Sequence, residues 1–144
     1  MALILENIIT YLKNSTTIVL TTVDHDNLPD IRTIGGYNFD GYILYFATSN
    51  TSEKVKQLQN NYHVTILVQH ENQTLPNYRN ITIYGSVKRL SGPEYAEGRT
   101  KLLEKRPDAV YEEESRSIYK VIPEKIKILD LSKKENEQIL VIKP

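Results

Sequence analysis

The sequence predicts a mainly β fold: a small antiparallel β-barrel of six strands with three peripheral helices. Short runs of β-branched and aromatic residues recur along the chain, and Asn, Asp, Gly and Pro residues separate them. These runs follow one another directly instead of alternating with helices, which argues against a doubly wound α/β domain. The 144 residues are 40% hydrophobic and 25% charged, a composition typical of one globular domain, 1–144.

The first element is a short helix. Leu5, Ile8, Ile9 and Leu12 fall at positions i, i+3, i+4 and i+7, which is one face of a helix that ends near Asn14. We expect this face to pack on the core.

Three strands follow the helix. Residues 16–23 (TTIVLTTV) are β-branched or leucine throughout, and the turn residues up to Pro29 end the run. A second extended run starts at Asp30, so the two pair most simply as a hairpin. Residues 38–41 (NFDG) end in Asp-Gly, which suits a tight turn, and 42–48 (YILYFAT) form the next strand. The prediction is an antiparallel meander.

A second helix follows, because Val55, Leu58 and Tyr62 lie at helical spacing with polar residues between them. Asn50 or Thr51 is its expected N-cap.

The remaining elements are strands and one helix. Residues 64–68 and 81–87 read as strands, and Gly85 within the latter predicts a bulge or a close backbone contact. Pro93 opens the third helix, where the first turn tolerates its missing N–H. Residues 117–132 alternate apolar and basic side chains toward their end, which predicts a final strand with one solvent-exposed face.

Composition excludes several kinds of site. Eighteen basic residues balance eighteen acidic ones, which disfavours general nucleic-acid binding. Cysteine is absent from the sequence, so disulfides, thiol nucleophiles and Cys-type zinc sites are excluded. His25, His63 and His70 lack the spacing of metal ligands, and we interpret them as structural or exposed, with no metal site.

The N-terminal stretch looks apolar but lacks a basic region, and Glu6 interrupts it before a signal-peptide core can form. We find no apolar run as long as a membrane span, which needs about 18 residues. The expectation is a cytoplasmic protein with no membrane partner.

One segment concentrates polar groups, residues 48–54 (TSNTSEK) at the start of the second helix. Free N–H groups and the positive end of a helix dipole favour a phosphate there, and Lys54 adds a full charge. The alternative is an ordinary N-cap rich in hydroxyls. Arg32 favours the phosphate, because its strand is expected beside 42–48 and a guanidinium can hold a phosphate bidentately.

Several short motifs follow one another along the chain: Arg32, Phe46-Ala47-Thr48, Ser52-x-Lys54, Arg79-Asn80, I-x-I-x-G ending at Gly85, Arg89-Leu90-Ser91, Arg106-Pro107, and residues 119–132. In order and spacing they resemble the pyridoxamine 5'-phosphate oxidase-like family, whose fold is an antiparallel split β-barrel that binds FMN. The shorter members, general stress proteins and nitroimidazole-resistance-type flavoproteins, are the more similar ones. The match extends over nearly the whole chain.

The resemblance implies a homodimer with FMN at the interface. It implies a phosphate site formed by Arg32, Thr48, Ser49, Ser52 and Lys54. It also implies that the backbone of Thr33, Ile34 and Gly35 lies near the isoalloxazine ring and that Asn80 contacts the ring through its amide.

The chain departs from the family pattern at three places. Glu53 stands where a second basic residue is common, and its carboxylate should weaken FMN binding unless it points away. Tyr37 occupies the position of a lysine in authentic pyridoxamine 5'-phosphate oxidases. The tryptophan and Arg-x-His segment that end those oxidases have no counterpart. We therefore expect a different reaction.

Two functions follow as hypotheses. The first is an FMN-dependent oxidoreductase that acts on an unidentified small molecule and takes electrons from reduced nicotinamide or another donor. The flavin would supply the redox chemistry that the side chains lack. The second is a module that binds flavin, deazaflavin or haem without turnover.

Overall fold

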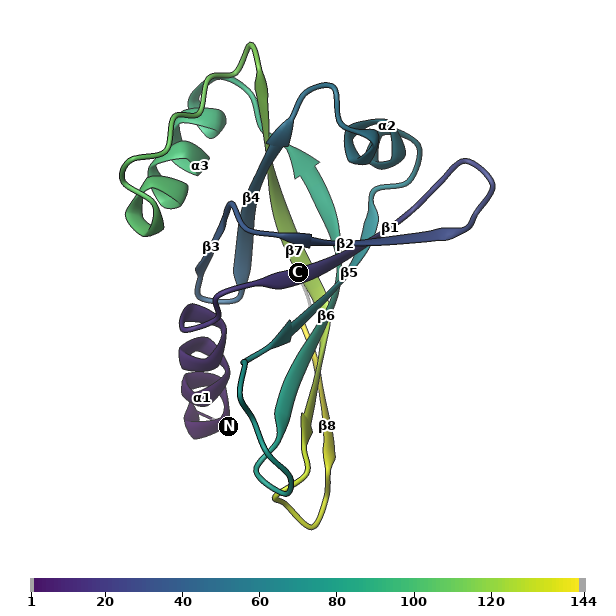
Figure 1. The fold of residues 1–144 in the computed structure, drawn as a ribbon, viewed down its shortest axis with the longest axis vertical. Coiled ribbons are helices and arrows are strands. Elements are labelled where there is room, and N and C mark those ends of the chain that lie inside the picture. Colours follow the sequence, from purple (N-terminus) through teal and green to yellow (C-terminus); the bar gives the residue numbers. More distant parts are fainter. Residues whose placement is uncertain (1, 143–144) are drawn as a thin grey trace.

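A computed structural model describes the backbone of residues 2–142 and the side chains from Asn7 to Ile142. The predicted domain also includes Met1, Lys143 and Pro144, and the predicted first helix includes the side chain of Leu5. These lie outside the described residues. Figure 1 shows the elements α1 (Ala2–Lys13), β1 (Ile18–Val23), β2 (Pro29–Ile34), β3 (Tyr37–Asp40), β4 (Ile43–Ser49), α2 (Glu53–Asn60), β5 (His63–Gln69), β6 (Arg79–Arg89), α3 (Gly92–Lys105), β7 (Arg116–Asp130) and β8 (Glu137–Val141).

Within residues 2–142 the strands form one antiparallel sheet in the order β2-β1-β5-β6-β7-β4-β3, and β8 pairs with β7. β2 and β3 lie at opposite ends of this order, yet only Gly35 and Gly36 separate them in the chain. The sheet must therefore curl until its two ends meet, and the N–H of Ala47 on β4 donates to the carbonyl of Gly36 across 2.9 Å. This confirms the mainly β class and the split barrel.

The structure corrects two details of the prediction. It contains eight strands in its described part instead of six, because residues predicted as a turn form β3 and the polar C-terminal stretch pairs as β8. The meander is also wrong: β2 pairs with β1, whereas β4 lies between β3 and β7. Barrel closure, not strand pairing, places β2 near β4.

The predicted irregularity at Gly85 is confirmed. The pairing of β6 with β7 shifts register between Tyr84 and Gly85. A Cβ atom at Gly85 would lie 2.4 Å from the carbonyl oxygen of Ile122, so only glycine fits without a backbone shift.

The helices cover different parts of the barrel (Figure 1). α1 packs against β3, α2 against β1 and β4, and α3 against β3, β4 and β7. Beneath α3 lies a second apolar cluster, separate from the barrel core, made of Tyr45, Leu90, Tyr95, Leu102, Tyr111 and Ile118. None of the helices within residues 2–142 combines the length and hydropathy needed to cross a bilayer.

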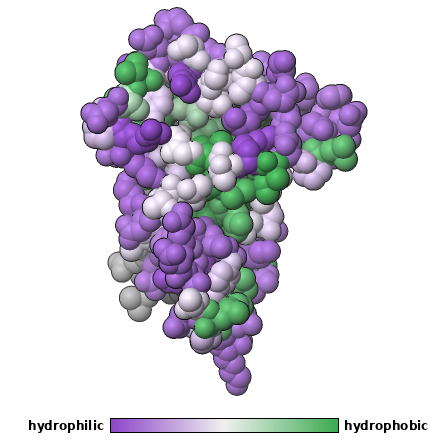
Figure 2. Space-filling view, viewed as in Figure 1, coloured by the Kyte–Doolittle hydropathy of each residue, from purple (hydrophilic) through white to green (hydrophobic). Residues whose placement is uncertain are grey.

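One face of the sheet points away from the barrel core, and we call it the outer sheet face. In the strand register its residues form two rows: Thr33, Val19, Leu67 and Thr82, and Ile31, Thr21, Thr65 and Tyr84. These side chains are exposed or half-buried, and Ile31 is 67% exposed. Figure 2 shows hydrophobic side chains in the middle of the viewed face, where β1 and β2 cross in Figure 1.

Candidate functional site

The turn from β4 into α2 holds three of the side chains predicted for a phosphate site. Thr48 is buried at the end of β4, and its Oγ1 donates to Oγ of Ser52 across 3.1 Å. Oγ of Ser49 lies 3.1 Å from Oγ1 of Thr51. The hydroxyls therefore bond to one another within a short turn.

The N-cap of α2 is Ser52, not Asn50 or Thr51. Asn50 is occupied elsewhere: its Oδ1 accepts from Ser117 across 2.6 Å, and its Nδ2 donates to the carbonyl of Glu113. The side chain of Ser52 makes no capping hydrogen bond. The backbone N–H groups in the first turn of α2 therefore lack a capping side chain. Together with the positive end of the helix dipole, they favour the binding of an anion.

Two cations from different elements approach each other beside this helix end. Lys54 lies in the first turn of α2 and is half-buried, and Arg32 extends from β2. Burial lowers the pKa of Lys54 below its ordinary value, and the nearby Arg32 lowers it further, while Asp30 opposes them. No ion pair of Lys54 occurs among the described side chains. An anion bound there would offset the lost hydration and the repulsion.

The guanidinium of Arg32 is held by its own chain. Nη1 donates to Oγ1 of Thr22 across 2.6 Å and to the carbonyl of Leu20 at 3.4 Å. Nη2 donates to Oε1 of Gln57 across 3.1 Å and pairs with Asp30 at 2.9 Å. The terminal N–H groups are therefore engaged, and the bidentate phosphate contact expected from the sequence would require an exchange of partners.

Glu53 does not face the two cations. Its carboxylate lies 3.8 Å from the ammonium of Lys56, and its side chain is 67% exposed. The carboxylate of Glu53 therefore points away from Arg32 and Lys54 and should not weaken the binding of a phosphate there.

Gln57 is the residue that sequence reasoning missed. It is buried, bonds to Thr22 and Arg32, and its Nε2 donates to Asp30 across 3.0 Å. The amide thereby joins α2 to β1 and β2. Its position three residues after Lys54, on the same helix face, was a signal that could have found it.

Residues 4–130 match the family model for pyridoxamine 5'-phosphate oxidase. This match covers most of the chain. The protein belongs to the pyridoxamine 5'-phosphate oxidase family. No curated protein matches the sequence.

Solved structures of relatives share the fold. General Stress Protein 26 from Bacillus anthracis str. Sterne is 21% identical with a TM-score of 0.69, over 96% of this chain and 98% of that one. A NimC/NimA family protein from Clostridium acetobutylicum is 18% identical with a TM-score of 0.72, over 96% and 92%. A heme binding protein from Mycobacterium smegmatis is 15% identical with a TM-score of 0.78, over 95% and 57%.

The residues that the family resemblance places near a flavin ring lie at the end of β2. Ile34 is buried, while Thr33 and Gly35 are exposed. β2 pairs only with β1 among the described strands, so alternate backbone groups on its other edge point away from the sheet. Backbone donors and acceptors are thus available close to Arg32.

Asn80 lies apart from the other predicted residues within one chain. It is near the start of β6, and β1 and β5 separate that strand from β2. Three inter-strand spacings amount to about 14 Å. The structure therefore brings together the hydroxyls, Lys54 and Arg32, but not Asn80.

Tyr37, where authentic oxidases of the family have lysine, faces a lysine from another element. The ammonium of Lys105 lies 3.5 Å from the centroid of the Tyr37 ring and donates to the carbonyl of Ser15. Burial lowers the pKa of Lys105 to about 8, and the neighbouring Lys13 and Arg106 contribute to this shift. The positive charge beside this position is therefore carried by Lys105 on α3 and not by residue 37.

Proposed function

We propose that this protein binds FMN and acts as an oxidoreductase on a small molecule, as a homodimer in the cytoplasm. The observation that carries the proposal is the half-buried Lys54 beside Arg32 at the uncapped start of α2. Two adjacent cations with a row of hydroxyls fit the charge and the hydrogen-bonding needs of a phosphate monoester.

Each residue of this cluster has a separate role in the proposal. Lys54 supplies the charge and the free donor, because its ammonium has no protein partner among the described side chains. Arg32 supplies a fixed second charge, oriented by Thr22, Gln57 and Asp30. The hydroxyls of the β4–α2 turn add neutral donors.

The cofactor would supply hydride and electron transfer when bound. The chain's own part is to hold the ring, and the exposed edge of β2 at Thr33 and Gly35 offers backbone groups for that purpose.

The outer sheet face supports the homodimer. It presents β-branched, leucine and tyrosine side chains in register across four strands. A second copy on this face would bury it and would bring its own Asn80 toward the cofactor, which one chain alone does not do.

The reaction differs, in our proposal, from pyridoxamine 5'-phosphate oxidation. Tyr37 replaces the family's lysine, and Lys105 from α3 occupies the space over its ring. Tyr37 itself is only 1% exposed, so the charged group at this position is the ammonium of Lys105 and not residue 37.

Titration with FMN tests the proposal. Purified full chain, freed of bound flavin, should quench FMN fluorescence in a saturable manner and become yellow. Reduction by NADH or NADPH, followed by reoxidation with a quinone or a nitro compound, should then occur in repeated cycles. Saturable quenching without turnover would overturn the oxidoreductase part, and the absence of quenching would overturn the whole proposal.

A binding module without turnover is the second candidate. The terminal N–H groups of Arg32 already have protein partners, so Lys54 is the main group available to bind an anion. A single ammonium binds a carboxylate as well as a phosphate. The carboxylates of haem offer this chemistry, and one structural neighbour is named as a heme binding protein. Competition between hemin and FMN, followed by the absorption of each, distinguishes the two: tighter hemin binding favours this candidate.

A further inference from the structure

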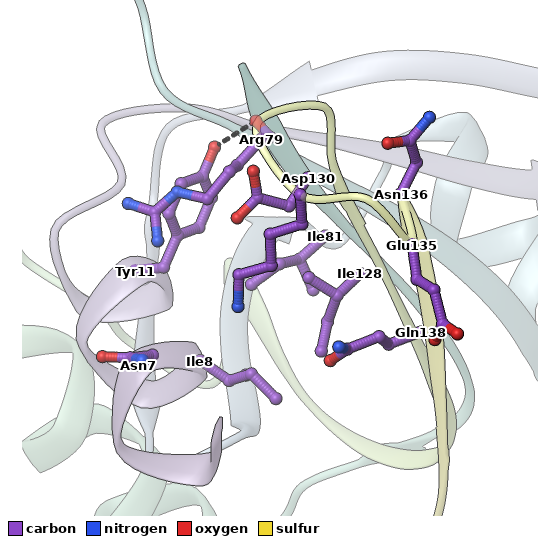
Figure 3. Close-up of a pocket in the computed structure, with 11 residues that line it drawn as sticks. Asn7, Ile8, Tyr11, Arg79, Ile81, Ile128, Asp130, Glu135, Asn136 and Gln138 are labelled. Atoms are coloured by element: carbon purple, nitrogen blue, oxygen red, sulfur yellow. Dashed lines mark hydrogen bonds between the residues drawn. The ribbon is translucent and has the colours of Figure 1, made fainter. Parts of the chain in front are cut away.

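A cavity of about 50 Å³ lies between α1 and the ends of β6 and β7, with β8 on its far side. Figure 3 shows the side chains of Ile8, Ile81 and Ile128 reaching into this space, with Arg79 and Asp130 above them. One water needs about 10–15 Å³, so the cavity accommodates only a small group of atoms. None of the residues of the proposed phosphate cluster lines it.

Arg79 and Asp130 stand between this cavity and a more open hollow. The hollow measures about 310 Å³ and is otherwise lined by Gln73, Asn77 and Ser132, all polar. A ligand bound here could place an apolar part on the three isoleucines and a polar part at Arg79 and Asp130.

The backbone of Arg79 is held by side chains of other elements, and its guanidinium forms no ion pair with a described side chain. Its carbonyl accepts from the hydroxyl of Tyr11 across 2.7 Å, and its N–H donates to Oε1 of Gln73 across 2.9 Å. The guanidinium lies over the ring of Tyr11, 5.1 Å from the centroid, and that ring stacks on His70. No hydrogen bond of the guanidinium to another described residue occurs in the structure.

Asp130 lies directly opposite Arg79 in the pairing of β6 with β7, a position at which opposite charges commonly pair. Here Ser132 holds the aspartate instead, through its N–H at 3.0 Å and its hydroxyl at 2.6 Å, both to Oδ1. Burial raises the pKa of Asp130, but the bonds from Ser132 and the charges of Arg79 and Lys133 outweigh it, so the net pKa is below its ordinary value.

The other charged side chains that line the cavity are Lys133 and Glu135, one of each sign. The site therefore presents separated positive and negative groups above an apolar floor. A simple anion or a simple cation would satisfy only half of it.

We propose that this cavity and the adjoining hollow together bind a small zwitterion, an α-amino acid with a short aliphatic side chain. Its carboxylate would bind the guanidinium of Arg79, its ammonium the carboxylate of Asp130, and its side chain the three isoleucines. This site is independent of the flavin proposal.

Calorimetric titration of the full chain with L-valine tests the proposal. Isovalerate, which lacks the ammonium, and isobutylamine, which lacks the carboxylate, should each bind about tenfold more weakly or worse, because each loses a charge-assisted contact. Failure of L-valine to bind at millimolar concentration, or equal affinity for all three probes, would overturn it.

Two variants assign the charges. Asp130→Asn keeps an acceptor for Ser132 and should remove the preference for L-valine over isovalerate. Arg79→Gln should remove the preference for L-valine over isobutylamine, and Arg79→Lys, which keeps the charge, should restore part of it. Arg116→Gln, at an exposed arginine outside the cavity, is the control and should bind L-valine as the wild type does. Unchanged preferences in both Asp130→Asn and Arg79→Gln would contradict the assignment.

Discussion

Arg32 and Lys54 are neighbours with different tasks. Arg32 is tied to Thr22, Gln57 and Asp30, so it belongs to the packing of α2 on the barrel as much as to a ligand site. Lys54 lies beside it without such ties. The structural contribution of one cation and the ligand contribution of the other can therefore be measured separately.

Replacing Arg32 should destabilise the fold. In Arg32→Ala the buried Thr22 and Gln57 lose a donor, which we expect to lower the free energy of unfolding by about 2–4 kcal/mol. Urea unfolding measures this. Arg116→Ala, at an exposed arginine, is the control and should change it by less than about 0.5 kcal/mol. Equal effects of the two substitutions would show that the Arg32 contacts contribute nothing.

Lys105 should make stability depend on pH in the alkaline range. The pKa of Lys105 in the folded chain is about 8, against 10.5 for an ordinary lysine. Between these values the unfolded chain binds more protons, so this group makes the fold more stable as pH rises. The free energy of unfolding of the wild type, relative to Lys105→Met, should therefore increase above about pH 8. A pH-independent difference would contradict this.

At the scale of elements, glycine permits two close contacts of different kinds. A Cβ at Gly85 would meet the backbone of Ile122, whereas one at Gly98 would meet two side-chain methyl groups, Cδ1 of Leu90 at 2.8 Å and Cγ2 of Ile118 at 3.0 Å. The end of the Leu90 side chain can move, and alanine favours a helix by about 1 kcal/mol over glycine. We therefore expect Gly85→Ala to cost about 1–3 kcal/mol and Gly98→Ala distinctly less, by urea unfolding. A larger cost at Gly98 would be the contrary result.

The local sequence pattern predicted most helices and strands, but not which strands pair with one another. The strand runs, the helix periodicity and the bulge at Gly85 follow from side-chain type and spacing. β3 was missed because Tyr37–Asp40 contains Asn and Asp, which signal a turn, although three of its four residues are buried. The wrong pairing of β2 with β4 has a different origin: barrel closure and the pairing of β4 with β7 depend on contacts distant in sequence.

The candidate site was predictable to a similar degree. The hydroxyls and Lys54 lie within one short segment, so local helix-start chemistry found them. Thr22 and Asp30 could not be found that way, because their contacts with Arg32 depend on strand register and on the packing of α2.

At the scale of the whole molecule, the outer sheet face should hold two copies together. Leu67 lies near its middle, and Leu67→Lys should shift the protein from dimer to monomer and weaken FMN binding, because a charge would be buried at the interface. Sedimentation at micromolar concentration measures the mass. Val110→Lys, at an exposed valine elsewhere, is the control and should remain dimeric. A monomeric wild type would contradict the dimer.

Binding of FMN and of riboflavin should be compared, because the two ligands differ only by the phosphate. We expect the wild type to bind FMN at least about tenfold more tightly than riboflavin, by fluorescence quenching. Lys54→Ala should remove most of this difference, and Lys56→Ala, whose ammonium faces Glu53, should keep it. Equal affinities of the wild type for FMN and riboflavin would contradict a phosphate site at Lys54.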